Sequence, residues 1–218
     1  MERNEITEFF KNNAYLGEKA MQDTVSLEPE KNYASYQIIG TRRKQEDRIG
    51  VEEKPGQLLA VVCDGMGGLA GGEQASAEAV NRLLEDYRER DVADAGQFLL
   101  EEAIKLDILV NEMENEEKQR LGAGTTLVAV LVQRGKLYYV SVGDSRIYLM
   151  RGKEMVMLTE DHNYGLMLRR ALENGTMDEE EFRRESRQAE ALISYIGMGG
   201  LRAVSYNGTE PVRLKQGD

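Results

Sequence analysis

The 218-residue sequence predicts an α+β fold, in which strands and helices occupy separate stretches of the chain. Short runs rich in β-branched and apolar residues lie on either side of two long segments that carry apolar residues at helical spacing. The two helical segments cover residues 73–90 and 98–120. The length fits one domain, or one domain with an appendage.

The strands are predicted from runs in which apolar and polar residues alternate, and from short continuous apolar runs, each bounded by turn residues. Pro55-Gly56 and Arg134-Gly135 mark turns between successive strands. The predicted strands are 34–40, 47–53, 57–63, 125–133, 136–142, 145–150, 154–158, 194–196, 204–206 and 212–215. The order is strands, then two helices, then strands again, which is typical of α+β proteins.

The two central helices are expected to bury one face each. Their core-facing residues are Ala77, Val80, Leu83, Leu84 and Tyr87 in the first, and Leu99, Ala103, Leu106, Leu109 and Val110 in the second. The acidic run Glu112–Glu117 is interpreted as a solvated face of the second helix. A densely charged segment, residues 162–187, is also expected to be helical.

Residues 1–30 are polar and charged, and we interpret them as an N-terminal extension that precedes a domain of residues 31–218. A short helix is expected at residues 4–13, where Ile6, Phe9 and Phe10 give a partial apolar face. The first residues lack the apolar stretch of a secretory signal.

Charge and composition exclude several classes of protein. The formal net charge of −11 argues against nucleic acid as a partner, because a phosphate backbone needs a basic surface. We expect no membrane association, because the apolar runs are short and no basic amphipathic stretch is evident. The single cysteine, Cys63, excludes an internal disulfide and is interpreted as a small buried residue. These features favour a cytoplasmic protein of bacterial type.

The most informative stretch is Leu58–Glu73, where a buried strand ends at Asp64 and a glycine-rich segment follows. Glycine lets the main chain approach a ligand closely, and Asp64 offers charged oxygen beside it. Three interpretations are open on this pattern alone: a dinucleotide loop, a divalent metal site, and a tight turn with an ordinary aspartate.

The dinucleotide interpretation fits only in part. Residues 65–70 match G-x-G-x-x-A after a strand, and Glu85 lies where the acidic residue of that fingerprint is expected. However, Asp64 would place a negative charge against the pyrophosphate, and Glu85 falls inside a predicted helix. A glycine pattern of this kind is a weak signal.

A second acidic group, Glu46 and Asp47, favours the metal site. Carboxylate and carbonyl oxygens are the ligands that Mg²⁺ and Mn²⁺ prefer. The chain has one histidine and one cysteine, which essentially excludes a zinc site with nitrogen or sulfur ligands. A Ser-His-Asp triad is nearly excluded as well, because His162 would be its only base.

Six motifs resemble those of the PPM-type (type 2C) metal-dependent Ser/Thr protein phosphatases, bacterial branch, in family order. They cover roughly residues 33–218. They are Arg42 with Gln45-Glu46-Asp47, Asp64 to Gly68 (D-G-M-G-G), Gly122 to Thr126, Val142 to Arg146, Leu158 to His162, and Ile196 to Gly199. The resemblance implies a central antiparallel β-sandwich flanked by helices on both faces. It also implies metal-dependent hydrolysis of phosphoserine and phosphothreonine in proteins that a bacterial Ser/Thr kinase has phosphorylated.

The resemblance implies a role for each matched residue. Asp64 would bridge two Mg²⁺ or Mn²⁺ ions and the Gly65 carbonyl would bind one of them, while Glu46 and Asp47 would surround the second, partly through water. Asp144 resembles the ligand of a weaker third ion, although a plain turn residue is an equal alternative. Arg42 would hold the substrate phosphate through a charge-assisted fork, the alternative being a surface charge beside Arg43 and Lys44.

Other matched residues are expected to act structurally. Gly122 to Thr126 would shape a turn and the start of a strand, and Ser145 and Arg146 would be structural. His162 would cap or orient a segment, about residues 162–190, that resembles the mobile flap of the family.

The family sequence continues with a Ser-Asp-Gly strand end and an Asp-Asn pair that complete the first metal site, whereas this sequence ends at Asp218. The last strands of the sandwich are missing with them. We expect a fragment of a longer phosphatase. The alternative is a non-catalytic, phosphatase-like binding module without a complete metal site.

Overall fold

The computed structural model describes residues 24–27, 33–42, 44–67 and 71–218. These residues fall into two compact units, 1–45 and 46–218. In the first unit, β1 (Thr24–Leu27) pairs antiparallel with β2 (Ala34–Gln37), with Thr24 opposite Gln37. The predicted helix at 4–13 lies outside the described residues.

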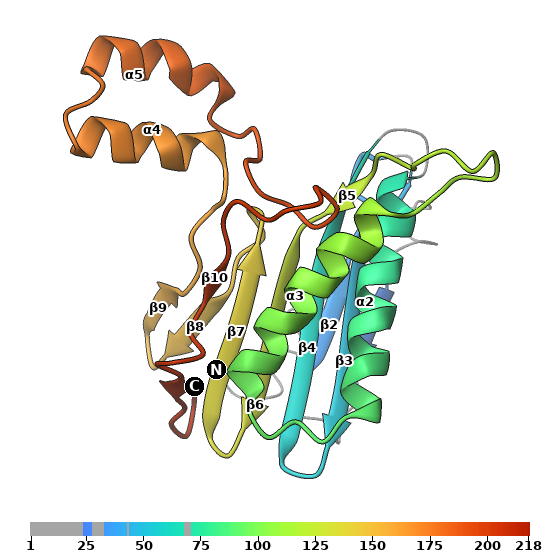
Figure 1. Ribbon diagram of the computed structural model, residues 1–218. Coiled ribbons are helices and arrows are strands. Elements are labelled where there is room, and N and C mark those ends of the chain that lie inside the picture. The colour runs from blue at the N-terminus through green and yellow to red at the C-terminus, as the bar shows by residue number, and fades with distance from the viewer. Residues whose placement is uncertain (1–23, 28–32, 43, 68–70) are drawn as a thin grey trace. The chain divides into compact units, whose positions relative to one another are not determined.

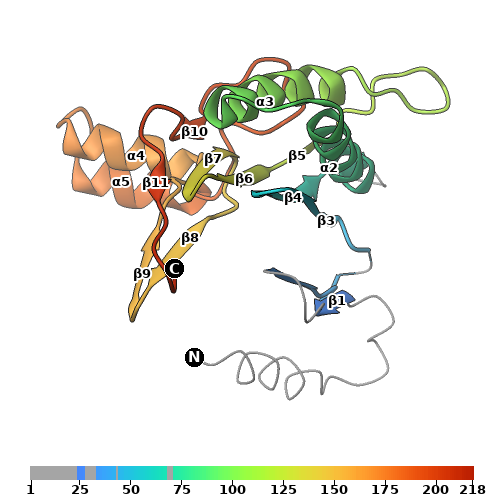
Figure 2. The ribbon, with the colours of Figure 1, turned by 90° about the horizontal axis from the view of Figure 1, so that it is seen from below.

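The second unit is built around an antiparallel sheet of seven described strands, with the order β10-β7-β6-β4-β3. β5 pairs with β4 and β11 pairs with β7 at its margins (Figures 1 and 2). The bounds are β3 Asp47–Lys54, β4 Gln57–Met66, β5 Gly124–Thr125, β6 Leu127–Gln133, β7 Lys136–Val142, β10 Ser205–Tyr206 and β11 Val212–Arg213.

Tight turns set the register of the sheet. β6 and β7 are joined by Arg134 and Gly135, whose φ angles of 54° and 71° are both positive, as a type I′ hairpin turn requires. Pro55 and Gly56 join β3 to β4, so that Lys54 lies opposite Gln57. Both turns were predicted from the sequence, and both are confirmed.

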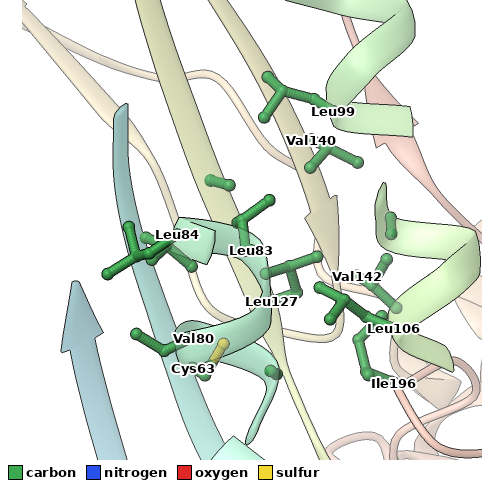
Figure 3. Close-up of a cluster of buried hydrophobic side chains, with 14 of the residues drawn as sticks. Cys63, Val80, Leu83, Leu84, Leu99, Leu106, Leu127, Val140, Val142 and Ile196 are labelled. Atoms are coloured by element: carbon green, nitrogen blue, oxygen red, sulfur yellow. The ribbon is translucent and has the colours of Figure 1, made fainter. Parts of the chain in front are cut away.

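Helices α2 (Gly71–Glu89) and α3 (Ala95–Asn111) cover one face of this sheet (Figure 2). Side chains alternate along a strand, so every second residue of β4 points toward the helices: Leu59, Val61 and Cys63 are all buried. Leu83 of α2 and Leu106 of α3 pack into the same cluster (Figure 3). The predicted core-facing residues of both helices are confirmed as buried, except that Ala77 and Leu109 are only half-buried.

The second helix ends nine residues earlier than predicted, and this corrects the interpretation of Glu112–Glu117 as a helix face. After Glu112 the chain turns, with Lys118 at φ 59° and a bridge between Glu114 and Arg120. The cause is Asn115, whose Oδ1 accepts hydrogen bonds from the backbone N–H groups of Glu117 and Gln119 at 3.0 and 2.9 Å. Such a side-chain acceptor competes with helical hydrogen bonding.

Two smaller elements complete the unit. β8 (Tyr148–Arg151) and β9 (Glu154–Met157) form a separate hairpin. Helices α4 (Tyr164–Glu173) and α5 (Glu179–Glu185) lie side by side and are followed by a 3₁₀ turn, η3 (Ser186–Gln188), within the segment expected to be helical (Figure 1).

The strand predicted at 194–196 is not formed, and Ile196 makes only a single bridge with Thr125. Positive φ angles at Gly197, Gly199 and Gly200 end the extended backbone there. The α+β class is confirmed, and the described residues show one sheet of the expected sandwich with its helical layer. No described helix is both long and apolar enough to cross a bilayer.

Candidate metal centre

Two of the predicted carboxylates face each other across neighbouring strands. Asp47 of β3 lies directly opposite Asp64 of β4 in the ladder, so both side chains are on the same face of the sheet. The backbone N–H of Gly65 donates to the carbonyl of Glu46 at 3.1 Å. The structure therefore brings the side chains of Asp47 and Asp64 to one face at the end of the β3–β4 pair, and it places the backbone of Glu46 beside Gly65.

The backbone of Asp64 is fixed on both sides by two threonines. Its N–H donates to Thr126 Oγ1 at 2.9 Å, and its carbonyl accepts from the Thr126 N–H at 2.9 Å. The hydroxyl of Thr125 donates to the same carbonyl at 3.0 Å. These bonds hold the end of β4 in place while leaving the carboxylate of Asp64 to other partners.

Glycine allows α2 to approach this strand end closely. A Cβ atom at Gly65 would lie 2.1 Å from the carbonyl oxygen of Gly72 and 2.8 Å from that of Glu46. The hydroxyl of Ser76, on α2, donates to the Glu46 carbonyl at 2.5 Å. The first turn of α2 and the start of β3 are thus packed directly against the backbone of Gly65.

Asp144 follows β7 in a loop that also reaches this region. Burial raises the pKa of its carboxyl group, and the carboxylates of Asp161 and Asp64 raise that pKa further. Ser145, the next residue, shares a 2.7 Å hydrogen bond with Thr126 Oγ1. The loop that carries Asp144 is therefore tied to the same threonine that holds Asp64.

Arg42 belongs to the first compact unit. Its N–H donates to the Ile39 carbonyl at 3.2 Å, and Gln45 Nε2 donates to the Ile38 carbonyl at 2.8 Å. The role of Arg42 in binding phosphate stays a prediction. Arg43 lies outside the described residues.

The structure gives the dinucleotide interpretation no support in the described residues. Glu85 lies on an exposed face of α2, where it is 3.7 Å from Arg82 in an i,i+3 pair. It is not at the end of a second strand, where the ribose-binding acid of that fingerprint is needed. Gly68, Leu69 and Ala70 lie outside the described residues.

His162 is a buried structural residue. Its Nδ1 accepts from the Gly143 N–H at 3.2 Å, which leaves Nε2 to donate to Ser205 Oγ at 2.9 Å. Its own N–H donates to the Gly143 carbonyl at 2.9 Å. His162 thus joins the base of the α4–α5 segment to the loop of Asp144, in line with the expected orienting role.

We expect His162 to make the protein less stable in mild acid. Burial lowers the pKa of its imidazole, against the opposing effect of Glu160 and Asp161. Below about pH 6.5, the usual histidine value, the unfolded chain binds a proton that the folded protein does not. The stability contributed by neutral His162 is therefore complete above that pH and declines as the pH falls toward the folded pKa.

The measurement is the free energy of unfolding of the wild type and of His162→Gln at pH 7.5 and pH 5.5. The advantage of the wild type over the variant should shrink at pH 5.5, because glutamine does not titrate. An equal difference at both pH values would contradict this account.

The donors gathered here suit a hard divalent cation. They are carboxylate oxygens and, at Gly65, a backbone carbonyl, whereas burial raises the pKa of the Cys63 thiol to about 12. Like charges directly opposite each other on neighbouring strands are unfavourable, and a cation between Asp47 and Asp64 would offset this. Among the described residues, no three His, Cys, Asp or Glu side chains form a complete metal cluster. The residues fit part of a hard-cation site.

The comparisons with known proteins agree with this chemistry. The family profile described as Protein phosphatase 2C matches residues 38–192, which include every predicted site residue. The chain belongs to the protein phosphatase 2C family.

Two curated relatives show the extent of the similarity. The serine/threonine phosphatase stp of Listeria monocytogenes serotype 4b is 32% identical over 167 residues, which are 73% of this chain and 64% of the relative. Protein phosphatase PhpP of Streptococcus pneumoniae is 30% identical over 131 residues, 59% of this chain and 52% of the relative. The chain spans less than two thirds of the length of these protein phosphatase 2C relatives.

Solved structures share the fold. The serine/threonine phosphatase of S. agalactiae superimposes with a TM-score of 0.66 at 23% identity, over 88% of this chain and 73% of that one. The phosphatase PstP/Ppp of Mycobacterium tuberculosis gives a TM-score of 0.60 at 25% identity, over 76% of this chain and 67% of that one. The chain therefore has the fold of the protein phosphatase 2C family.

From the sequence, Thr125 and Thr126 are expected only to shape a turn and the start of a strand. The structure shows that they also fix Asp64. A signal was present, because two adjacent hydroxyl residues directly precede the apolar run of residues 127–132. What could not be seen is that this strand start lies beside the end of β4, since the two are about sixty positions apart.

Proposed function

We propose that this chain carries the metal-dependent site of a protein phosphatase that hydrolyses phosphoserine and phosphothreonine. The observation that carries the proposal is the opposition of Asp47 and Asp64 at the end of β3 and β4, beside the backbone link from Gly65 to Glu46. Family membership supports it, because the named relatives are serine/threonine phosphatases.

Asp64, the Gly65 carbonyl, Glu46 and Asp47 would hold two divalent ions, Mg²⁺ or Mn²⁺, and Asp144 would contribute to a third. When bound, such ions make water nucleophilic at neutral pH and offset the charge of a phosphoryl group. Thr125 and Thr126 keep the backbone of Asp64 fixed, so that its carboxylate does not have to reorganise. Arg42 would bind the substrate phosphate through two parallel N–H donors.

We place the catalytic domain in residues 31–218, after an extension of residues 1–30. The flap-like segment, about residues 162–190, would border the active site. Hydrogen bonds at the base of this segment support that placement. The Ile193 N–H donates to the His162 carbonyl, and His162 Nδ1 accepts from the N–H of Gly143, the residue before Asp144.

The substrates would be proteins phosphorylated by a bacterial Ser/Thr kinase. The net charge of −11 disfavours nucleic acid as a partner, and the cytoplasmic location stays a prediction.

The test measures cation binding and turnover on the same 218-residue chain. Titration calorimetry with MnCl₂ should show uptake, and a phosphothreonine peptide should be hydrolysed with Mn²⁺ and not after addition of EDTA. Turnover that persists in EDTA would overturn the proposal. A folded chain that takes up no Mn²⁺ at millimolar concentration would instead support a phosphatase-like binding module.

A further inference from the structure

A buried carboxylate on α3 holds four consecutive backbone N–H groups. Asp107 is 3% exposed. Its Oδ1 accepts from Gly197, Met198 and Gly199 at 2.8, 2.9 and 3.2 Å, and its Oδ2 accepts from Gly200 at 2.6 Å. These are charge-assisted bonds, which are stronger than bonds between neutral groups.

The loop of residues 197–200 has a backbone that only glycine adopts readily. Gly197, Gly199 and Gly200 have φ angles of 104°, 74° and 151°, and together they turn successive N–H groups toward one point. The arrangement resembles the concave nests of N–H groups that bind anions. In this protein the anion is supplied by the chain itself, since the Asp107 carboxylate fills the nest.

The same loop is packed against the segment that holds Asp64. A Cβ atom at Gly197 would lie 2.7 Å from Val110 Cγ1 and 2.8 Å from the Ala123 carbonyl oxygen. A Cβ atom at Gly124 would lie 2.5 Å from the ring of Tyr195. Packing this close leaves the loop and residues 123–125 little freedom to move independently.

Hydrogen bonds continue this connection to the candidate metal centre. Ile196 and Thr125 exchange two backbone bonds of 2.8 and 3.0 Å. The Thr125 hydroxyl then donates to the carbonyl of Asp64 at 3.0 Å. A continuous path therefore runs from Asp107 through the glycine loop, Ile196 and Thr125 to Asp64.

We propose that Asp107 is a positioning residue for the metal centre. By holding residues 197–200, it fixes Ile196 against Thr125 and so fixes the backbone that presents the Asp64 carboxylate. Asp107 itself contacts neither substrate nor cation in this account. Its effect on cation binding rests on the proposed function, whereas its effect on the Thr125 backbone does not.

The test compares Asp107→Asn with Asp94→Asn. Asparagine at 107 keeps the shape and one acceptor oxygen, but it loses the charge and places an N–H₂ group against an N–H donor. Asp94 is the matched control: it lies on the same helix, where it caps the N-terminus by accepting from the Gln97 N–H at 3.0 Å, and it is exposed. Both variants remove one carboxylate from α3, and only one of them touches the loop.

Amide hydrogen exchange is the first measurement. In Asp107→Asn, the amides of residues 197–200 and of Thr125 should exchange roughly tenfold to a hundredfold faster than in the wild type. In Asp94→Asn, they should exchange as in the wild type once global stability is matched with urea. Unchanged protection of Thr125 in Asp107→Asn would overturn the inference, even if the wild type bound no Mn²⁺ and the proposed function had failed.

Mn²⁺ affinity is the second measurement, made per folded molecule. We expect Asp107→Asn to bind Mn²⁺ roughly tenfold more weakly and Asp94→Asn to bind it as the wild type does. Thr125→Val, which removes the hydroxyl that reaches Asp64, completes a double-mutant cycle. If both residues act along one path, the double variant should bind no more weakly than the weaker single variant. Independent, multiplicative losses would overturn the inference.

If Asp107→Asn does not fold, the wild type and Thr125→Val still decide the matter. In the wild type, the amides of residues 197–200 should be protected although they lie outside any helix or strand. In Thr125→Val, this protection should be retained while Mn²⁺ affinity falls, since the change lies beyond the loop on the path. Rapid exchange at residues 197–200 in the wild type would overturn the inference.

Discussion

Asp64→Asn is expected to lower Mn²⁺-dependent phosphopeptide hydrolysis by roughly a hundredfold to a thousandfold. Asparagine keeps the size of the side chain and its place opposite Asp47, but it removes the charged oxygen that would bridge the cations. The backbone bonds to Thr125 and Thr126 do not involve the carboxylate, so the strand end should be preserved. The measurement is kcat at saturating Mn²⁺, with calorimetric Mn²⁺ binding alongside.

Urea denaturation of the same variant checks that the fold is retained. Asp91→Asn is the matched control, since Asp91 is exposed and lies between α2 and α3. Its activity should equal that of the wild type. Activity of Asp64→Asn within tenfold of the control, at equal stability, would show that Asp64 does not hold the cations.

Gly65→Ala is expected to destabilise the second unit by about 3 kcal/mol or more, because the added methyl group has no space. Its Cβ would lie 2.1 Å from the Gly72 carbonyl oxygen and 2.5 Å from the carbon of that carbonyl. Both are backbone atoms of α2, so no side chain can rotate away to relieve the contact. Urea denaturation followed by circular dichroism measures the loss.

Gly56→Ala provides the comparison for this prediction. Gly56 lies in the β3–β4 turn with φ 71°, and a Cβ atom there would meet nothing within 4 Å. Only the backbone conformation is then unfavourable, at about 1–2 kcal/mol. A loss for Gly65→Ala no greater than that for Gly56→Ala would mean that α2 moves easily away from the strand.

Much of the candidate site could be predicted from the sequence because its central contact is local. The strands on either side of Pro55-Gly56 were identified from their apolar pattern, and a two-residue connection sets the pairing of the whole hairpin. Once Lys54 is opposite Gln57, Asp47 must be opposite Asp64. The convergence of these two carboxylates therefore follows from the turn.

Other features depend on contacts between distant parts of the chain. Asp107 is one polar residue within a helical segment of the sequence, and its partners lie about ninety positions away. The early end of α3 depends on how the Asn115 side chain binds its neighbours, which hydrophobic spacing does not report. Ile196 was predicted to end a strand of residues 194–196. The glycines that follow it instead bend the chain toward Asp107.

The alternation of side chains along β4 keeps the single thiol away from the acidic pair. Cys63 points into the helix-covered core with no exposed surface, and Asp64, the next residue, points to the other side of the sheet. The Cys63 thiol, a ligand that soft metals such as copper prefer, therefore points away from the acidic end of β4, although Cys63 and Asp64 are adjacent in sequence. The pleat of a single strand thus keeps this thiol from competing with the two carboxylates for a cation.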